Sequence, residues 1–157
     1  MNHKTSKWIV LALIGGCYLA SLALPAFSYM SHVPPDHVEG KIEIVPGWFA
    51  VCFGPMGLLS LSATALPFFA NYTFLGGAQL YALEHYRKAA VLAVLSAGLG
   101  ASFFWMSGSH PMPVLFSGQD DYMNHPVPML GFYVWMASFA LLLLGAFFGK
   151  LMARARN

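Results

Sequence analysis

The chain has 157 residues, of which 58% are hydrophobic, 15% aromatic and only 9% charged. A soluble domain normally carries about 25% charged residues, so this composition is typical of an integral membrane protein. The net charge of +2 is too small to indicate nucleic-acid binding, and the chain has no P-loop, GxSxG elbow or HExxH helix. We therefore expect one membrane domain over residues 1–157, with the lipid bilayer as its partner and no nucleic acid bound.

The first apolar stretch predicts a transmembrane helix over residues 8–28, following two lysines. Two processing signals compete with it: a signal-peptidase site after Ser28 and a loose lipobox at residues 14–17. The apolar run continues well past Cys17, which argues against the lipobox, and the later spans need a packing partner, so we expect the helix to be retained. Because Cys52 lies in a separate segment, we expect both cysteines to be free, buried thiols.

The next region, residues 46–85, is nearly all apolar or small and is too long for one span. Two crossings would place the basic pair at 87–88 on the opposite side from the N-terminal lysines, which the positive-inside rule disfavours. Proline and glycine interrupt its first part, so we predict a short interfacial or re-entrant helix at 47–59. The second span then covers residues 62–85. The alternative is a span at 47–69 followed by an interfacial cytoplasmic segment.

Two further apolar blocks predict spans at 89–108 and 129–149. With four spans, seven of the eight basic residues lie on the cytoplasmic side and only Lys41 lies outside. The predicted fold is thus an all-α membrane protein, a four-helix bundle with both termini inside. Two polar loops, 29–46 and 107–128, lie outside.

Four short motifs follow this predicted order of elements. They are LPAF at 24–27, PGW at 46–48, FFAN at 68–71 and GFYVWMASF at 131–139. In these motifs the chain resembles a family of small, uncharacterised bacterial membrane proteins with four predicted spans. The resemblance covers most of the chain and implies a multi-pass protein of the bacterial cytoplasmic (inner) membrane. It implies no activity, since the family has none that can be named.

The polar side chains of the two outer loops are the candidate metal ligands. They comprise His32, His37, His110, Asp120, Asp121 and His125. Imidazole and carboxylate together suit zinc or another divalent transition metal. However, His32 and His37 are not a helical i, i+4 pair, and proline-rich loops give no fixed ligand geometry. We expect a solvated polar cap and no cofactor, with a divalent-metal site as the alternative.

Inside the predicted spans the informative feature is the absence of Asp, Glu, Lys, Arg and His from their cores. Proton relays and transporters of charged substrates normally place such residues there, so these functions are disfavoured. Asn71 is the most polar residue at depth, and counting from the span ends places Ser138 at a similar level. We expect Asn71 to hydrogen-bond a neighbouring helix, with a polar notch for a ligand as the alternative.

Small residues predict where helices approach closely. Alanine recurs every four residues along the third span, at 89, 93, 97 and 101, and Gly145 and Gly149 form a second seam. Such faces pack within the chain or bind a protein partner. The residues proposed for a partner are Ala93, Ala97, Ala101, Gly145 and Gly149.

Together these patterns predict a non-enzymatic accessory or scaffold subunit of a membrane assembly. Two alternatives stay open. One is a membrane immunity-type or receptor-type binder of a secreted partner, and the other is a metal-handling protein that uses the histidines and aspartates of the outer loops.

Overall fold

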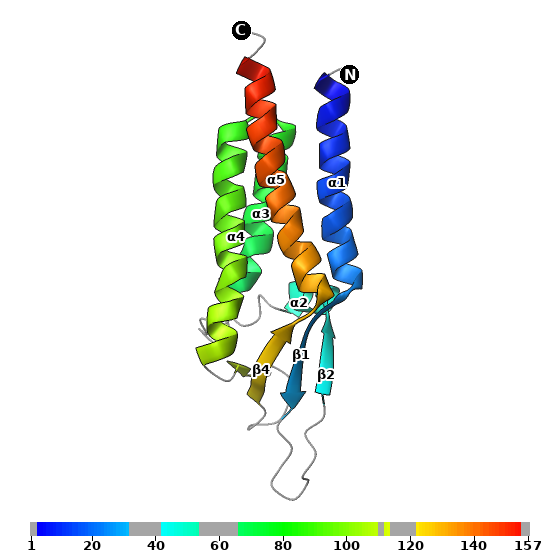
Figure 1. Ribbon diagram of the computed structural model, residues 1–157, viewed down its shortest axis with the longest axis vertical. Coiled ribbons are helices and arrows are strands. Elements are labelled where there is room, and N and C mark those ends of the chain that lie inside the picture. The colour runs from blue at the N-terminus through cyan, green and yellow to red at the C-terminus, as the bar shows by residue number, and fades with distance from the viewer. Residues whose placement is uncertain (1–2, 32–41, 54–65, 110–111, 114–121, 155–157) are drawn as a thin grey trace, which may run out of the picture.

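The computed structural model describes residues 3–31, 42–53, 66–109, 112–113 and 122–154. It is mostly helical, and its long helices lie side by side (Figure 1). They are α1 His3–Ala23, α3 Leu66–Ala82, α4 Tyr86–Ser109 and α5 Leu130–Arg154. Within the described ranges three of them are long and apolar enough to cross a membrane, in α1, α4 and α5. The exception, α3, has 17 residues.

The helix boundaries differ from the predicted spans at several ends. The first span was expected to continue to residue 28, but α1 ends at Ala23, because Pro25 removes a backbone donor and disfavours helix at the residue before it. The first part of the helix predicted at 47–59 is present as α2, Gly47–Phe53, and the rest of it lies outside the described residues. The alternative span was expected to end at residue 69, but α3 continues through this position to Ala82.

A four-stranded antiparallel sheet stands at one end of the helices, in the order β2-β1-β4-β3 (Figure 1). Its strands are β1 Pro25–Ser31, β2 Ile42–Pro46, β3 Met112–Pro113 and β4 Tyr122–Pro128. The chain is mostly helical, as predicted, but this sheet departs from the predicted all-α fold. The prolines are compatible with a sheet because several of them begin or end strands, where a missing N–H costs little.

The sheet has two different faces. Phe27 and Val45 are paired across β1 and β2, and both are buried, as is Tyr29. These side chains pack on the ends of α4 and α5, where the Phe103 ring lies 5.6 Å from Phe27 and 5.0 Å from Phe132. The aromatic cluster fixes the sheet onto the helices.

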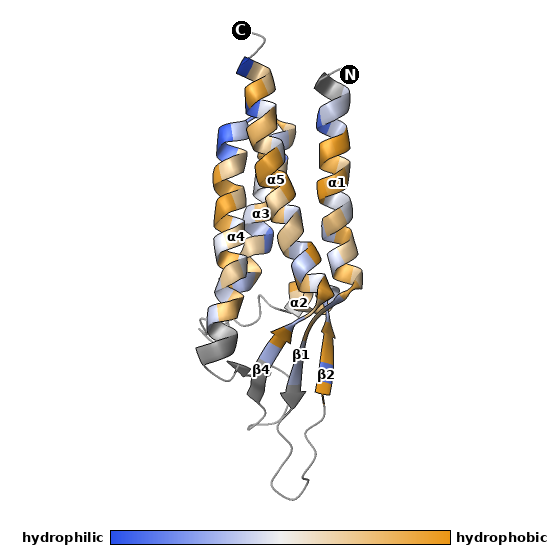
Figure 2. Ribbon diagram, in the orientation of Figure 1, coloured by the Kyte–Doolittle hydropathy of each residue, from blue (hydrophilic) through white to orange (hydrophobic). Residues whose placement is uncertain are grey.

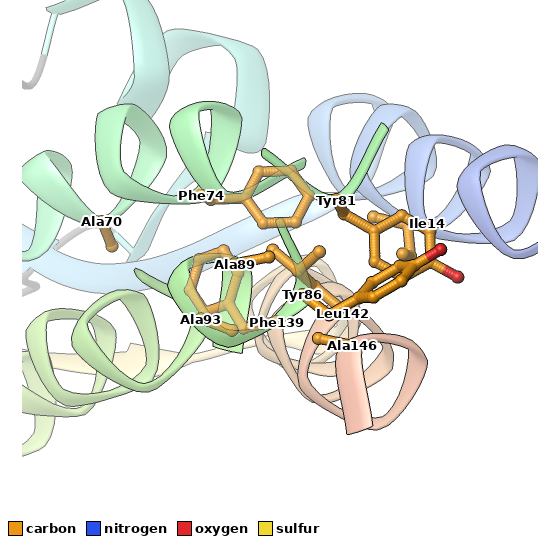
Figure 3. Close-up of a cluster of buried hydrophobic side chains, with 10 residues drawn as sticks. All are labelled: Ile14, Ala70, Phe74, Tyr81, Tyr86, Ala89, Ala93, Phe139, Leu142 and Ala146. Carbon is orange, nitrogen blue, oxygen red and sulfur yellow. The ribbon is translucent and has the colours of Figure 1, made fainter. Parts of the chain in front are cut away.

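The main core lies between the helices (Figure 3). It is formed by Ile14, Ala70, Phe74, Tyr81, Tyr86, Ala89, Ala93, Phe139, Leu142 and Ala146. The Phe74 and Phe139 rings lie 5.2 Å apart, and alanines of α4 fill the space beside them. Large rings on α3 and α5 are thus matched by small side chains on α4.

The predicted alanine face of α4 is only partly buried. Ala89 and Ala93 are buried, Ala97 is half-buried and Ala101 is exposed. A strict four-residue spacing turns by about 40° at each step around a helix with 3.6 residues per turn, so the stripe rotates out of the contact. Ser96 and Gly100, both buried, continue the contact instead.

The glycine seam of α5 is covered by the chain's own helices. A Cβ added at Gly145 would lie 2.7 Å from Cγ1 of Val10, and one at Gly149 would lie 2.6 Å from the Tyr86 ring. Both glycines therefore permit close contacts within the chain.

A tight turn joins α3 to α4. The Glu84 N–H donates to the Tyr81 carbonyl at 3.0 Å, and the His85 N–H donates to the Leu80 carbonyl at 2.9 Å, which is a Schellman cap. Glu84 occupies the position that usually carries glycine, with φ 66°. Its carboxylate accepts a hydrogen bond from Lys7 Nζ at 2.8 Å, which ties α1 to this turn.

Candidate functional site

The polar centre of the helical region is the amide of Asn71, which is only 6% exposed. Its Oδ1 accepts hydrogen bonds from Trp135 Nε1 at 2.9 Å and from the Tyr18 hydroxyl at 3.2 Å. Because an indole N–H can only donate, this contact fixes which amide atom is the oxygen. Asn71 therefore links α1, α3 and α5 through one acceptor atom, and its Nδ2 donates to the Phe68 carbonyl at 3.2 Å.

Ser138 is fully buried one turn along α5 from this centre. Its hydroxyl donates to the Trp135 carbonyl at 2.6 Å. Trp135 is thus the residue between the two predicted polar positions, with its indole bonded to Asn71 and its carbonyl to Ser138. Nothing in the sequence distinguishes Trp135 from the other tryptophans, whose amphipathic rings are expected at the membrane interface.

A second polar contact joins α3 to α4. The hydroxyls of Thr73 and Ser96 lie 2.8 Å apart, and Ser96 is fully buried. Serine and threonine bond across helices in this way in membranes, where no water competes. Thr73 was not among the residues singled out from the sequence.

A narrow cavity of about 50 Å³ lies beside Asn71, between the helices and the sheet. Its polar lining comes from Ser21, Asn71 and Trp135, whereas Phe27, Phe132 and the rest of its wall are almost entirely apolar. A cavity of about 150 Å³ binds benzene, so this one accommodates only a smaller apolar group. The described residues of its lining include no nucleophile–base pair.

Close backbone contacts shape the region around this cavity. A Cβ at Gly47 would collide with the Ser21 carbonyl, and one at Gly131 would lie 2.5 Å from the Pro25 carbonyl oxygen. Since these neighbours are backbone atoms, only glycine fits at the start of α2 and of α5 without a backbone shift. Cys52, on α2, is a free and exposed thiol, contrary to the expectation that it is buried, and Cys17 is free and half-buried.

Of the six predicted metal ligands, His125 lies in β4, and the other five lie outside the described residues, as does the side-chain environment of His125. The pairing of β1 with β4 places one strand from each of the two predicted polar loops side by side. Within the described part of the chain no group of three or more His, Cys, Asp and Glu side chains is placed to hold a metal ion.

The outward face of the sheet carries an apolar row that was not anticipated. Ser28 of β1 is paired with Ile44 on one side and with Val127 on the other, so the three lie on one face. Ile44 and Val127 are each 58% exposed, and Ile42, two residues along β2, is 64% exposed. The alternation in residues 42–45, which read IEIV, was the available signal, because a period of two predicts a strand with one buried face.

The two edge strands of the described sheet differ in length. β2 has five residues and is the outer strand, whereas β3, at the other edge, has two, one of which is proline. An edge strand presents unpaired N–H and C=O groups, and long apolar edges are the ones that pair with other chains. β2 with its exposed isoleucines is therefore the candidate interface.

No protein family model matches this chain, and neither curated proteins nor solved structures show a significant similarity to it.

Proposed function

We propose that the chain is a non-enzymatic, four-span protein of the bacterial inner membrane, an accessory or scaffold subunit that holds a partner protein through its outer sheet. The observation that carries this proposal is the sheet itself, which has one face packed on the helices and an exposed apolar row on the other. Soluble surfaces rarely gather exposed isoleucine and valine in a row unless another molecule covers them.

The length and position of α3 support the fourth span. A helix of 17 residues is about 26 Å long, close to the hydrocarbon thickness of about 30 Å and at the lower limit for a span. The tight turn at Glu84 makes α3 antiparallel to α4, which is long and apolar enough to cross. A helix that packs antiparallel along a membrane-spanning neighbour is expected to lie in the membrane as well.

The distribution of charge supports cytoplasmic termini. The two chain ends and the α3–α4 turn lie at the same end of the helices, opposite the sheet (Figure 1). Hydrophilic residues gather at this end, while the helices between are apolar (Figure 2). Lys7, the basic pair at 87–88, Lys150 and Arg154 lie there, and the positive-inside rule assigns such an end to the cytoplasm. The sheet is then extracytoplasmic.

Symmetry argues that the occupant of the β2 edge is a different protein. Two copies in one membrane are related by rotation about the membrane normal, and the strands run roughly along that direction (Figure 1). Such a rotation places two β2 strands parallel, with each N–H facing the same N–H of the other copy. This arrangement forms no ladder, because a parallel pair needs N–H groups opposite carbonyls.

The partner that fits is an extended, apolar segment of an extracytoplasmic protein, which adds a strand to the sheet at β2. Main-chain hydrogen bonds supply affinity in such complexes, and alternate side chains supply specificity. Here Ile42 and Ile44 would form the apolar contact on one face, and Glu43 lies on the other face beside the Tyr29 hydroxyl, 3.1 Å away.

Site-specific photo-cross-linking in the native host tests this proposal. A photoreactive residue at Ile44 should give one discrete adduct, and mass spectrometry should map it to an extended segment of a protein other than this chain. The matched control is Val91 on α4, which is similarly exposed at 56% but lies in a predicted span, and should give lipid adducts only. Ile44→Lys should abolish co-purification of the same partner without changing the circular dichroism spectrum.

Two outcomes would refute the proposal. The first is the absence of a protein adduct at Ile44 when the chain is at its native level. The second is an adduct that maps to another copy of this chain, since that would contradict the symmetry argument. A secreted partner, as opposed to a membrane-bound one, would favour the immunity-type alternative over the scaffold.

A further inference from the structure

The end of the molecule opposite the sheet contains an open depression of about 370 Å³ between the start of α4 and the end of α5. Four basic side chains line it: Arg87 and Lys88 from the first turn of α4, and Lys150 and Arg154 from the last turns of α5. They come from segments more than 60 positions apart in the sequence, so only the packing of α4 against α5 brings them together.

The positive charge of this depression is poorly compensated by the described residues. Among them its lining has one acid, Glu84, whose carboxylate is bonded to Lys7, a side chain that is 12% exposed. Within the described residues no ion pair is formed by the four basic side chains. Arg87 and Lys88 also lie at the helix N-terminus, where the macrodipole is positive and acidic residues would normally be favoured. The site therefore has an excess of positive charge that an external anion would neutralise.

We infer that this basic depression binds the phosphate group of an anionic phospholipid from the cytoplasmic leaflet. Guanidinium groups bind phosphate through paired N–H donors, and ammonium groups add point charge, so two arginines with two lysines suit an anionic phosphate group. Basic pockets between helices on the cytoplasmic side of a membrane bind lipid head groups by this chemistry.

The surroundings of the depression suit a lipid more than a free phosphate. One helical turn from Arg87 into the predicted span lies Val91, and one turn from Lys150 lies Phe147, and these side chains are 56% and 57% exposed. Residues at i, i+3 and i, i+4 share a helix face, so each basic residue is followed by an apolar side chain on its own face. A lipid whose phosphate is held in the depression would extend its acyl chains along these apolar side chains.

Thermal unfolding of the delipidated full chain in mild detergent tests the inference. Phosphatidylglycerol should raise the unfolding temperature in a saturable way, whereas phosphatidylcholine with the same acyl chains and inorganic phosphate at the same concentration should not. In Arg87→Gln/Lys150→Gln the apparent Kd for phosphatidylglycerol should increase about 30-fold, the factor for losing about 1 kcal/mol from each of two basic residues.

Two matched variants separate a site from general charge attraction. Lys4→Gln/Lys41→Gln removes the same formal charge at positions far in the sequence from the four basic residues and should keep the wild-type Kd. Arg87→Lys/Lys150→Arg should stay within a few-fold of it. The inference is overturned if both lipids stabilise equally, or if the two glutamine variants weaken binding by the same factor. Equal stabilisation by inorganic phosphate would also overturn it, because the site would then bind a soluble anion.

Discussion

Replacing Asn71 by leucine should destabilise the helical region by about 2 kcal/mol. The substitution removes the single oxygen that accepts both the Trp135 indole N–H and the Tyr18 hydroxyl. Interhelical hydrogen bonds in membranes contribute about 0.6 kcal/mol on average and at most about 1.7 kcal/mol each, so two bonds give about 1.2 to 3.4 kcal/mol. The expected loss of about 2 kcal/mol lies in the lower half of this range. Leucine restores apolar packing in a largely apolar site, and this offsets part of the cost of losing the two hydrogen bonds.

A double-mutant cycle identifies the source of the effect. Trp135→Phe removes the donor, so Asn71→Leu in the phenylalanine background should cost less than in the wild type, with a coupling energy of about 0.6 to 1.7 kcal/mol. Unfolding with sodium dodecyl sulfate in mixed micelles, followed by circular dichroism, measures each free energy without depending on tryptophan fluorescence. Ser96→Ala, which breaks the separate Thr73 contact, is the control and should be additive with Asn71→Leu.

The reasoning fails if Asn71→Leu is as stable as the wild type, or if the coupling with Trp135→Phe is below about 0.3 kcal/mol, the usual limit of additivity. The first result would mean that leucine packing compensates fully for both hydrogen bonds. The second would mean that the amide acts by filling space and that its hydrogen bonds contribute little.

Three further predictions concern other parts of the fold. Gly131→Ala should lower the free energy of unfolding by about 1–3 kcal/mol in the same assay, because the added Cβ would meet backbone oxygens. Gly98→Ala should be neutral or stabilising by up to about 1 kcal/mol, because a Cβ there has no neighbour within 4 Å. Equal effects of the two substitutions would contradict the packing described. Glu84→Gly should stay within about 1 kcal/mol of the wild type, since relief of the positive φ offsets the lost Lys7 bond, and Glu84→Ala should be the less stable of the two, with the opposite order refuting this account. Intact-mass spectrometry of the membrane-extracted protein should show that α1 is retained, because cleavage after Ser28 would cut β1 between paired residues; a mass matching residues 29–157 would refute it.

The long helices could be predicted from composition because burial in lipid requires about 20 apolar residues regardless of which neighbour they contact. Apolar runs and basic flanks therefore identified three candidate spans and the place of α3, although the ends were less accurate. The predicted end of α1 was five residues too late. The apolar segment LPAFS is compatible with either a helix or a strand, and only its pairing with β2 and β4 shows that most of it is a strand.

The sheet could not be recognised because its strands are short and come from two loops far apart in the sequence. β1 and β4 are separated by about 90 positions, and their pairing depends on how the helices bring their ends together. The high proline content of the loops also argued against strands. Proline is nevertheless compatible with the ends of strands, as at Pro25 and Pro128, and with register irregularities such as the one beside Pro126 in β4.

The sequence by itself determined that the chain has apolar runs long enough to cross a membrane, that charge is excluded from their cores and that Asn71 is the most polar residue within them, because these properties depend on residue type and spacing along one chain. Only the tertiary structure decided which groups meet: the indole that bonds Asn71, the apolar row on the sheet and the four cations around one depression. Each of these combines side chains from separate elements, and the relative rotation and depth of packed helices depend on shape complementarity, which no single segment encodes.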